Sequence, residues 1–500
     1  MLCLGGLIGL GLLDLIRIEG DFAHDVIIVF LLSLALIALG CLVRANLRAD
    51  REQKVFAELE AQRSLEMSRD GATGALVRRF FLDACERRIR AADASDRPMA
   101  YFAVDMDYLK ILNDSLGHDV GDAALRRLVQ AIRSCAGEDA IVGRLGGDEF
   151  AVLTDCASVD HAAEIAACLH AEIGRATTIH ARELTLSATI GIALLPAHTT
   201  FLSEAIQFSD LALYEGKKAG RNRATFFTRK MLGEFRQQQQ IERELRIGLE
   251  RGELRQLYLP VVDATGAVHA ARSVVEWTSR WLGPVPSETF IRVAETTSLI
   301  DRVGEWSLRR ACEDAMSFGG ELTVSVAVSA AQLKRDGVVD MVRRAIAETG
   351  ITPTRVTALV SRATTLPANA DIERRLNELR AIGIRISLDD LGAIVCDFER
   401  LRHFPIDVVR IRADQIAYLG ESETDNAVVS ALAGVGKVMG LEIVADGIAN
   451  AEQLLLARTA GCDLFSGPYF AEAMTVDGFC ERLARDEAKR HAREAVLLEA

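Results

Sequence analysis

Acidic side chains follow two apolar runs in the first half of the chain, at positions where they could bind a metal ion. The run Met99–Val104 has the pattern of a buried strand and ends in Asp105-Met106-Asp107. Further along, Gly146-Gly147-Asp148-Glu149 precedes a second apolar run, as a hairpin turn would. If the two strands are neighbours, Asp105 and Asp148 could share Mg²⁺ (or Mn²⁺), which prefers hard oxygen ligands. The predicted chemistry is metal-assisted phosphoryl transfer, although an isolated acidic turn of this kind is more often only a solvated loop.

The chain has 500 residues, and about 150 residues per domain predicts roughly three units to position these groups. Half of the residues are apolar (50%) and 26% are charged, which supports large cores and excludes disorder or a many-span transporter. The net charge of −13 is opposite to that of a phosphate-tracking surface, so no nucleic-acid partner is expected. The ten cysteines form no CxxC pair, and we expect reduced, mostly buried thiols.

The N-terminal region is predicted to anchor the chain in a membrane. Residues Val26–Val43 are uncharged over a length that suits a transmembrane helix; the alternative is a buried helix of a soluble domain. The shorter run Met1–Leu13 could be a second span, part of a hairpin or a cleaved signal. Arg44 and Arg48 follow the span, which places the rest of the chain in the cytoplasm, at a bacterial inner membrane. Residues 46–69 are predicted to form a signalling helix that could dimerise.

Residues 70–228 resemble the GGDEF family of diguanylate cyclases through four motifs in the correct order. Asp105–Asp114 is similar to DxDxFKxxND with Leu109 in place of Phe, and Gly117–Asp122 matches GHxxGD. Arg144–Phe150 matches RxGGDEF, and Asp210–Asn222 resembles DxALYxAKxxGRN with Gly216 in place of Ala. The resemblance implies an antiparallel-containing sheet with helices, similar to nucleotide cyclases and polymerase palms.

The same resemblance implies the role of each site residue. Asp105, Asp148 and the Met106 carbonyl would bind the metal, and Glu149 and Lys110 would complete the catalytic group. The implied substrate-binding residues are Asn113 and Asp122 for the guanine edge, Gly146 and Gly147 for phosphate clearance, and Lys217 and Arg221, with Lys110, for phosphate charge. Taken alone, Lys217 and Arg221 could equally be a solvated helix face.

The implied reaction condenses two GTP molecules into cyclic di-GMP, with each 3′-hydroxyl attacking the partner's α-phosphate. Each domain would supply half of the active site, so a homodimer is expected. The domain entry Asp70–Arg79 resembles DxLTGLxNRR only loosely, because Ala72, Ala75 and Val77 replace Leu, Leu and Asn. Gly137–Ala140 replaces the inhibitory Arg-x-x-Asp of many relatives, so we predict no product inhibition there.

The second half of the chain has the pattern of a (β/α)₈ barrel. After a polar helix over Met231–Glu250, eight apolar runs alternate with helical patterns. The runs are Gln256–Val262, Ala270–Trp277, Leu322–Val328, Val356–Val360, Ile384–Leu388, Val408–Ile411, Glu442–Ala445 and Cys462–Phe465. We therefore expect an α/β multidomain chain. Its expected parts are a membrane anchor (1–45), a helix (46–69), a GGDEF domain (70–228), a linker (229–239), a barrel (240–487) and a tail (488–500).

The barrel region resembles the EAL family of cyclic di-GMP phosphodiesterases over nearly its whole length, which implies a modified TIM barrel. Tyr258–Asp263 is similar to YQPIVD, Leu388–Gly392 to LDDFG, and Ala445–Ile448 to AEGV. Phe290–Ile300 and Ser329–Leu333 also match family segments.

Most catalytic positions that the family implies are changed in this chain. The metal and catalytic positions now hold Arg272, Ala327, Leu359, Arg362, Arg410, Arg412, Asp446 and Ser466, and the substrate positions hold Leu259 and Glu276. Asp389 and Asp390 alone remain of the acidic cage, and they cannot hold the metal pair that hydrolysis needs. We expect an inactive barrel in which these aspartates pair with Arg272 or Arg410.

The sequence therefore predicts a membrane-anchored diguanylate cyclase whose barrel regulates it or docks a protein partner. One alternative is a non-catalytic scaffold or receptor that responds to GTP or cyclic di-GMP. A second alternative, a GTP-stimulated phosphodiesterase, conflicts with Arg272, Ala327 and Leu359.

Overall fold

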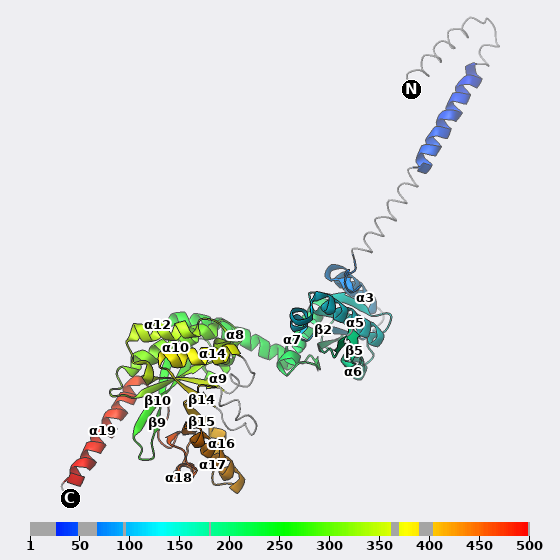
Figure 1. The fold of residues 1–500 in the computed structure, drawn as a ribbon. Coiled ribbons are helices and arrows are strands. Elements are labelled where there is room, and N and C mark those ends of the chain that lie inside the picture. Colours follow the sequence, from blue (N-terminus) through cyan, green and yellow to red (C-terminus); the bar gives the residue numbers. More distant parts are fainter. Residues whose placement is uncertain are drawn as a thin grey trace. The chain divides into compact units, whose positions relative to one another are not determined.

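The computed structural model describes residues 27–48, 68–93, 97–179, 182–361, 370–389 and 404–498. The chain divides into two compact units, Met1–Phe235 and Arg236–Ala500, which we describe one at a time (Figure 1).

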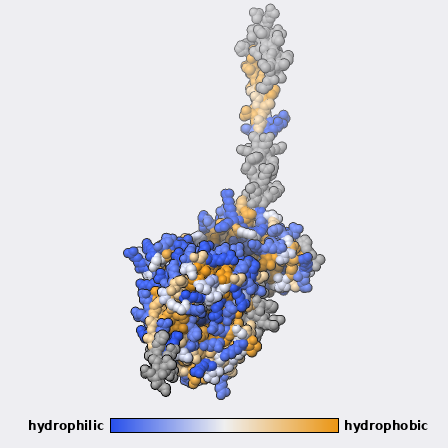
Figure 2. Space-filling model, turned by 60° about the vertical axis from the view of Figure 1, so that its left-hand side comes forward, coloured by the Kyte–Doolittle hydropathy of each residue, from blue (hydrophilic) through white to orange (hydrophobic). Residues whose placement is uncertain are grey.

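A helix near the N-terminus, Ile27–Arg48, is long and apolar enough to cross a membrane. None of its most apolar 18-residue window is buried, and Figure 2 shows it as a largely hydrophobic rod. Length and composition are the only grounds for this, and a signal sequence or a core helix can meet the same test. The predicted run Met1–Leu13 and most of the predicted helix 46–69 lie outside the described residues.

The first unit is built on a six-stranded sheet with mixed strand directions. Its strand order is β1 (Leu76–Val77), β3 (Ile141–Arg144), β4 (Glu149–Asp155), β2 (Met99–Met106), β7 (Ala188–Leu195) and β8 (Ala224–Phe226). Strand β4 pairs antiparallel with β3 and β2, and β2 pairs antiparallel with β7. The edge strands β1 and β8 run parallel to their neighbours β3 and β7. Strands β5 (Thr177–Ile179) and β6 (Arg182–Leu184) form a separate hairpin.

Helices cover both faces of this sheet because its central strands are buried on both sides. Helices α3 (Arg78–Asp93) and α7 (Leu202–Lys218) pack through Phe81 and Phe208 against one face. Helices α4 (Leu109–Leu116), α5 (His118–Ala136) and α6 (Val159–Gly174) cover the other face through residues such as Leu128 and Leu169. The buried residues of β2 alternate between the two cores, as the period of a strand requires.

Helix α8 (Arg229–Arg251) begins in the first unit and ends in the second. Residues 229–239, which the sequence predicted as a linker, therefore lie within one continuous helix. Leu232 and Phe235 pack on the core of the first unit, whereas Ile241 and Leu245 are buried in that of the second.

The second unit is a closed eight-stranded barrel, as predicted. Its strands are β9 (Leu254–Val262), β10 (Val268–Ser279), β12 (Thr323–Val328), β13 (Val356–Ser361), β14 (Arg385–Asp389), β15 (Val408–Ile411), β16 (Glu442–Asp446) and β17 (Leu464–Ser466). Strand β9 closes the ring by pairing antiparallel with both β10 and β17, which departs from an all-parallel barrel. A short strand, β11 (Gly283–Val285), forms a hairpin with β10.

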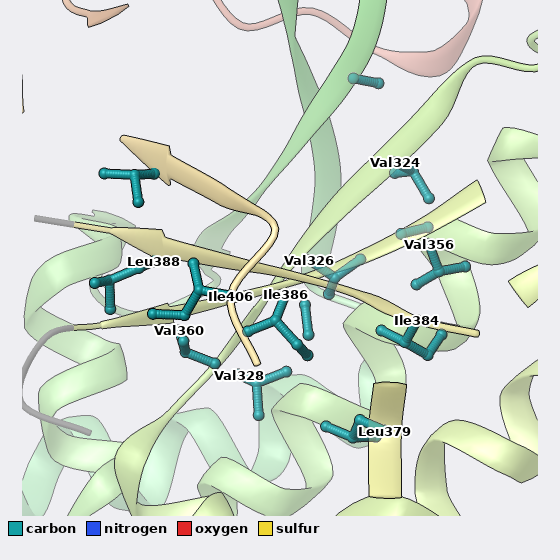
Figure 3. Packing of buried hydrophobic residues seen from close by; sticks show 14 of the residues in the cluster. Val324, Val326, Val328, Val356, Val360, Leu379, Ile384, Ile386, Leu388 and Ile406 are labelled. Atoms are coloured by element: carbon teal, nitrogen blue, oxygen red, sulfur yellow. The ribbon is translucent and has the colours of Figure 1, made fainter. Parts of the chain in front are cut away.

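Helices surround the barrel and pack on the outward residues of its strands. They are α9 (Ser287–Glu295), α10 (Leu299–Ala315), α11 (Ala330–Lys334), α12 (Val338–Thr349), the 3₁₀ turn η1 (Pro353–Arg355), α14 (Ala370–Ile382), α16 (Ala413–Ala417), α17 (Glu423–Val438), α18 (Ala451–Thr459) and α19 (Val476–Leu498). Figure 3 shows alternate strand residues such as Val324, Val326 and Ile386, together with Leu379 of α14, in this outer core. The residues between them, such as Ser325 and Ser387, face the barrel interior.

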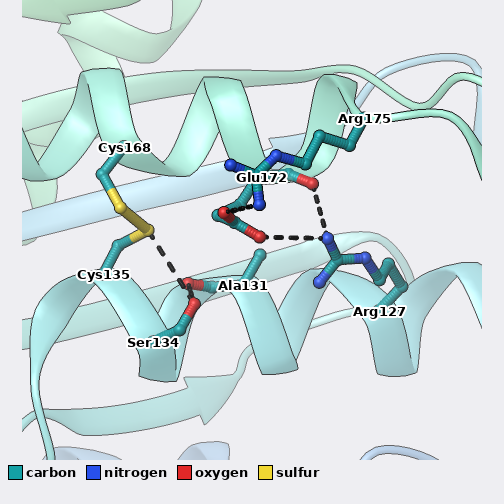
Figure 4. Close-up of a disulfide and its surroundings, with 7 residues drawn as sticks. All are labelled: Arg127, Ala131, Ser134, Cys135, Cys168, Glu172 and Arg175. Atoms are coloured by element: carbon teal, nitrogen blue, oxygen red, sulfur yellow. Dashed lines mark hydrogen bonds and ion pairs between the residues drawn. A yellow bond between two sulfur atoms is a disulfide. The ribbon is translucent and has the colours of Figure 1, made fainter.

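The expectation that all cysteines are reduced is wrong for one pair. Cys135 near the end of α5 and Cys168 on α6 are joined by a disulfide (Figure 4). The two helices pack side by side and bring the Cα atoms within 5.8 Å, a tertiary proximity that the spacing of 33 residues does not reveal. Cys85, Cys156, Cys312 and Cys462 are buried free thiols, as predicted.

Candidate functional site

The predicted acidic residues of the first unit meet at one end of its sheet. In the register of β2 and β4, Asp105 lies opposite Glu149, so their side chains share a face. The Met106 amide donates a hydrogen bond to the Asp148 carbonyl at 3.2 Å, which fixes the Gly-Gly turn against the end of β2. The structure therefore places Asp105, Met106, Asp148 and Glu149 together, as the sequence analysis required.

The Gly146-Gly147 turn is held by Arg144, to which the sequence analysis gave no role. Its guanidinium donates to the carbonyls of Gly146 and Gly147 and to Asp70 Oδ1, the last at 2.9 Å. Thr73 also donates its amide and its hydroxyl to Asp70 Oδ1. The loosely matched domain entry thus contacts the Gly-Gly turn through Asp70, which is retained although Ala72, Ala75 and Val77 depart from the family pattern.

Asp105 is buried and forms an ion pair with Lys217, whose Nζ lies 2.7 Å from Oδ2. Burial raises the pKa of Asp105 above its ordinary value; Lys217 opposes this increase, while Asp148 and Asp107 add to it. The last turn of α7 thus delivers Lys217 to the acidic end of β2, although the two residues are far apart in sequence.

Asp107 is a second residue whose role was missed. It accepts hydrogen bonds from the Thr189 hydroxyl (2.7 Å) and from the Asn222 amide (3.1 Å). These bonds hold the turn after α7, where Arg221 and Asn222 have positive φ angles, against the end of β2. The guanidinium of Arg221 lies 5.3 Å from the ring centroid of Tyr108.

The predicted guanine-binding residues lie on the adjoining helices α4 and α5. Asn113 Oδ1 is buried and has no hydrogen-bond partner within the described part of the chain. It lies so close to Gly121 that a Cβ there would be 1.8 Å from it, so Gly121 makes room for the amide. Asp122 follows on α5 and is partly exposed. A buried amide oxygen that lacks a partner suits a ligand that donates hydrogen bonds.

A small cavity of about 270 Å³ lies beside the acidic turn, on the face covered by α3 and α7. Its charged lining residues are Arg78, Glu149, Asp210 and Lys217. Burial, reinforced by Glu149, raises the pKa of Asp210 to about 6. Lys110, by contrast, is exposed on α4.

The donor set of the first unit fits a hard divalent cation. Asp148 is close enough to Asp105 that its charge adds to the raised pKa of Asp105, and Met106 ends the same strand, β2. Within the described ranges, no cluster of three or more His, Cys, Asp or Glu side chains is arranged as a metal site. The protein would therefore offer a divalent cation two carboxylates and one backbone oxygen. Substrate phosphates would supply further ligands, as is usual for Mg²⁺.

The carboxyl ends of the barrel strands carry an ion network in place of an acidic cage. Arg272 on β10 donates to Asp446 Oδ2 at 3.0 Å and to Asp389 Oδ2 at 3.4 Å. Arg410 on β15 donates to both oxygens of Asp446, and its Nε lies 2.8 Å from Oδ2. Burial alone would raise the pKa of Asp446, but the two guanidinium groups outweigh it and lower the pKa. The expected pairing of Asp389 with Arg272 is present.

This end of the barrel does not fit a metal pair. Arg272, Ala327, Leu359 and Asp389 line a cavity of about 280 Å³ whose other walls are mostly apolar. Ala327 and Leu359 have no metal-binding atom in their side chains, and the positive charge of Arg272 repels a cation. Asp390 and Arg362 lie outside the described residues.

Two family models match the chain in tandem. The model described as "Diguanylate cyclase, GGDEF domain" matches residues 67–223, and the model described as "EAL domain" matches residues 242–473.

Similar proteins include enzymes of cyclic di-GMP metabolism. The cyclic di-GMP phosphodiesterase NbdA of Pseudomonas aeruginosa is 31% identical over 411 residues, which cover 81% of this chain and 52% of NbdA. The bifunctional diguanylate cyclase/cyclic di-GMP phosphodiesterase MucR of the same species is 31% identical over 452 residues, which cover 88% of this chain and 66% of MucR. The chain thus spans about half the length of NbdA and about two thirds of that of MucR.

One solved structure shares the fold. The S helix-GGDEF-EAL part of Vibrio cholerae LapD, bound to c-di-GMP, aligns with 83% of this chain and 99% of its own at a TM-score of 0.51 and 10% identity. With both family models matched in tandem and a closed barrel in the second unit, this chain belongs to the GGDEF–EAL family of tandem proteins that act in cyclic di-GMP signalling.

Proposed function

We propose that this protein is a membrane-anchored diguanylate cyclase that condenses two GTP molecules into cyclic di-GMP, and that its EAL barrel does not hydrolyse the product. The observation that carries the proposal is the contrast between the two sites. The first has Asp105 and Asp148 together at one strand end, and the second has a guanidinium where carboxylates would be needed.

In the proposed cyclase site, Asp105, Asp148 and the Met106 carbonyl would hold Mg²⁺ or Mn²⁺. When bound, the cation supplies a Lewis acid that promotes ionisation of the 3′-hydroxyl and neutralises the departing pyrophosphate. Gly146 and Gly147, which lack side chains, would leave space for phosphates, and Arg144 holds the carbonyls of both residues by hydrogen bonds. Asn113 and Asp122 would read the guanine edge.

Lys217 would bind a phosphate oxygen of the nucleotide in the proposed site. Its ammonium group is paired with Asp105, and it lies at the end of α7 next to the turn that carries Arg221. When a nucleotide arrives, Lys217 can exchange Asp105 for a phosphate oxygen, so no isolated charge is left buried. Lys110 and Arg221 would add to the positive charge around the phosphates.

Each GGDEF domain would hold one GTP, so two chains must bring their sites face to face. Helix Ile27–Arg48 would serve as the anchor in a bacterial inner membrane, with both domains in the cytoplasm. Anchoring in one membrane raises the effective concentration of the two halves. The barrel would then act as a regulatory or protein-docking module.

The test uses the full chain in detergent or nanodiscs with GTP and Mg²⁺, followed by chromatographic analysis of the nucleotides. We expect cyclic di-GMP, and a loss on the order of 10²–10³ in Asp148→Ala. Asp477→Ala, an exposed aspartate at the start of α19, is the matched control and should leave the rate unchanged. Bound GTP with no product from wild type would favour the alternative, a non-catalytic scaffold or receptor that responds to GTP or cyclic di-GMP.

The names of the relatives make cyclic di-GMP hydrolysis a second activity to test in the same assay, since NbdA is a phosphodiesterase and MucR is bifunctional. Added cyclic di-GMP should remain intact in the presence of Mg²⁺ or Mn²⁺, because Arg272, Ala327 and Leu359 do not fit a metal pair. Conversion to a linear dinucleotide would contradict the proposed inactivity of the barrel.

A further inference from the structure

The barrel contains a second cavity, at the opposite end from the family's catalytic positions. It has a volume of about 460 Å³ and opens at the amino-terminal ends of the parallel strands, beneath α19 and the loop Phe318–Leu322. This volume lies in the range of small-molecule sites and is far larger than the space for one water. It exists because the lower interior holds small residues such as Ser325 and Ser387, where barrels of this kind usually have bulky branched side chains.

The two walls of the cavity differ in chemistry. The wall formed by β12, β13 and β14 presents the hydroxyl groups of Ser325, Thr357 and Ser387, all buried. The opposite wall is apolar and consists of Val261, Ala270, Val408, Val444 and Leu464, which pack together as a cluster. A ligand that fills the space must therefore have a polar edge and an apolar face.

The charged groups deep in the cavity already have partners. Arg410 forms the roof and is bonded to Asp446, and Arg385 at the rim is paired with Glu442 at 2.9 Å. The mouth carries both signs of charge, including Glu321, Asp486 and Arg490. An uncharged ligand is therefore favoured deep in the cavity, because Arg410 and Arg385 are already paired with Asp446 and Glu442.

Ser387 supplies the observation that points to a ligand. Its side chain is 1% exposed and lines the cavity, yet its Oγ has no hydrogen-bond partner within the described part of the chain. A buried hydroxyl without a partner costs free energy, and its neighbours Thr357 and Ser325 can bond to the same edge of one molecule. A hydroxyl both donates and accepts, so the row can match the mixed donors and acceptors of a ring edge.

We propose that this cavity is a binding site for a small uncharged heterocycle of nucleobase size, held by Ser325, Thr357 and Ser387 on its polar edge and by the apolar cluster on its face. The site goes beyond the proposed cyclase function and does not depend on it. It gives the barrel a ligand that enters from the end opposite the altered catalytic positions. Arg410 lines the cavity and is also part of the ion network with Asp446 and Arg272. A bound ligand that contacts Arg410 can therefore change this network at the other end of the barrel.

The test measures binding of uracil and cytosine to the full chain in detergent, by saturation-transfer NMR and equilibrium dialysis. Saturating GTP is present throughout, so that the proposed cyclase site is occupied. Wild type should bind at least one base. Ser387→Ala and Thr357→Val should each weaken binding about tenfold, which corresponds to ~1.4 kcal/mol, close to one hydrogen bond.

Ser273→Ala is the matched control, because Ser273 is a buried serine of the same barrel that does not line this cavity, and it should bind as wild type does. Thermal unfolding of each variant checks the fold, and both cavity variants keep the side-chain volume nearly unchanged. Failure of wild type to bind either base, or equal binding by wild type, Ser387→Ala and Thr357→Val, would overturn the proposal.

Discussion

At the scale of single residues, the two domains use charged side chains in opposite ways. In the GGDEF domain, Asp105 is buried and paired with one lysine, Lys217. In the barrel, Asp446 accepts hydrogen bonds from two arginines, whose positive charges repel a cation. Carboxylates and basic side chains therefore form a single ion pair in one domain and a network of several ion pairs in the other.

The closed network predicts a large and pH-dependent loss of stability in Asp446→Asn. The variant leaves Arg410 buried without its counter-charge, so the free energy of unfolding of the barrel at pH 7 should fall by about 3–5 kcal/mol. Because the pKa of Asp446 is lowered in the folded state, its contribution is present above the unfolded value near 4 and is lost as the pH falls through the lower folded value. Denaturation in urea at pH 7 and pH 3 measures this.

Glu481→Gln, on the exposed side of α19, is the control for removing one carboxylate and should change little at either pH. An equal loss for Asp446→Asn at both pH values would contradict the assignment of this carboxylate as the charged partner of Arg410.

Gly121 predicts a specific defect in GTP binding. A Cβ at this position would collide with Asn113 Oδ1, and the flexible amide must move while the helix remains. Gly121→Ala should therefore raise the Kd for GTP about tenfold, from the loss of roughly one hydrogen bond, without loss of stability. Isothermal titration with a non-hydrolysable GTP analogue measures the effect.

Gly174→Ala is the matched control, because Gly174 ends α6 in the same domain and a Cβ there meets nothing within 4 Å. Unchanged nucleotide affinity in Gly121→Ala would argue against Asn113 as a guanine-reading residue.

At the scale of elements, helices and turns join segments that are distant in sequence. Arg144 connects the Gly-Gly turn to Asp70 at the domain entry, and Asp107 connects β2 to the turn after α7. The domain entry is therefore in direct contact with the Gly-Gly turn. The disulfide between α5 and α6 restrains the helix pair that covers the opposite face of the sheet.

Removal of the disulfide should lower the stability of the GGDEF domain only under oxidising conditions. Cys135→Ser removes a cross-link over 33 residues, and the expected loss is about 2–4 kcal/mol in the free energy of unfolding. With excess dithiothreitol, wild type and variant should unfold alike. Cys480→Ser, a free cysteine of the barrel, is the control. Alkylation of both Cys135 and Cys168 in the oxidised wild type would refute the bond.

At the scale of the whole molecule, an apolar helix precedes two folded domains with separate cores. Helix Ile27–Arg48 exposes its apolar side chains. Contact of so much apolar surface with water is unfavourable, so a membrane or a protein partner is expected to cover it. We propose that the bilayer covers them and that shared anchoring helps two GGDEF domains to meet.

Two charges in this helix should release the protein from membranes. Leu36→Arg with Ile37→Arg places both charges near the middle of the span, each costing about 2.5–3.5 kcal/mol. The double variant should move from the membrane pellet to the supernatant, and its cyclic di-GMP formation should become more sensitive to dilution. Val438→Arg, at a 90% exposed apolar residue at the end of α17, should stay in the pellet. Retention of the double variant in the pellet would exclude this helix as the sole anchor.

The sequence alone determined the domain types and the barrel strands, because motif order and the periods of apolar residues are local properties of the chain. It also predicted that Arg272, Ala327 and Leu359 stand where the family's motifs imply metal-binding side chains. Only the tertiary structure decided the partners of those groups. The contacts of Lys217 with Asp105, Arg144 with Asp70, and Cys135 with Cys168 join distant segments, and no local pattern encodes which pairs the packing brings together. The cavity beneath Arg410 has the same origin, because small residues on separate strands make a space only after the barrel closes.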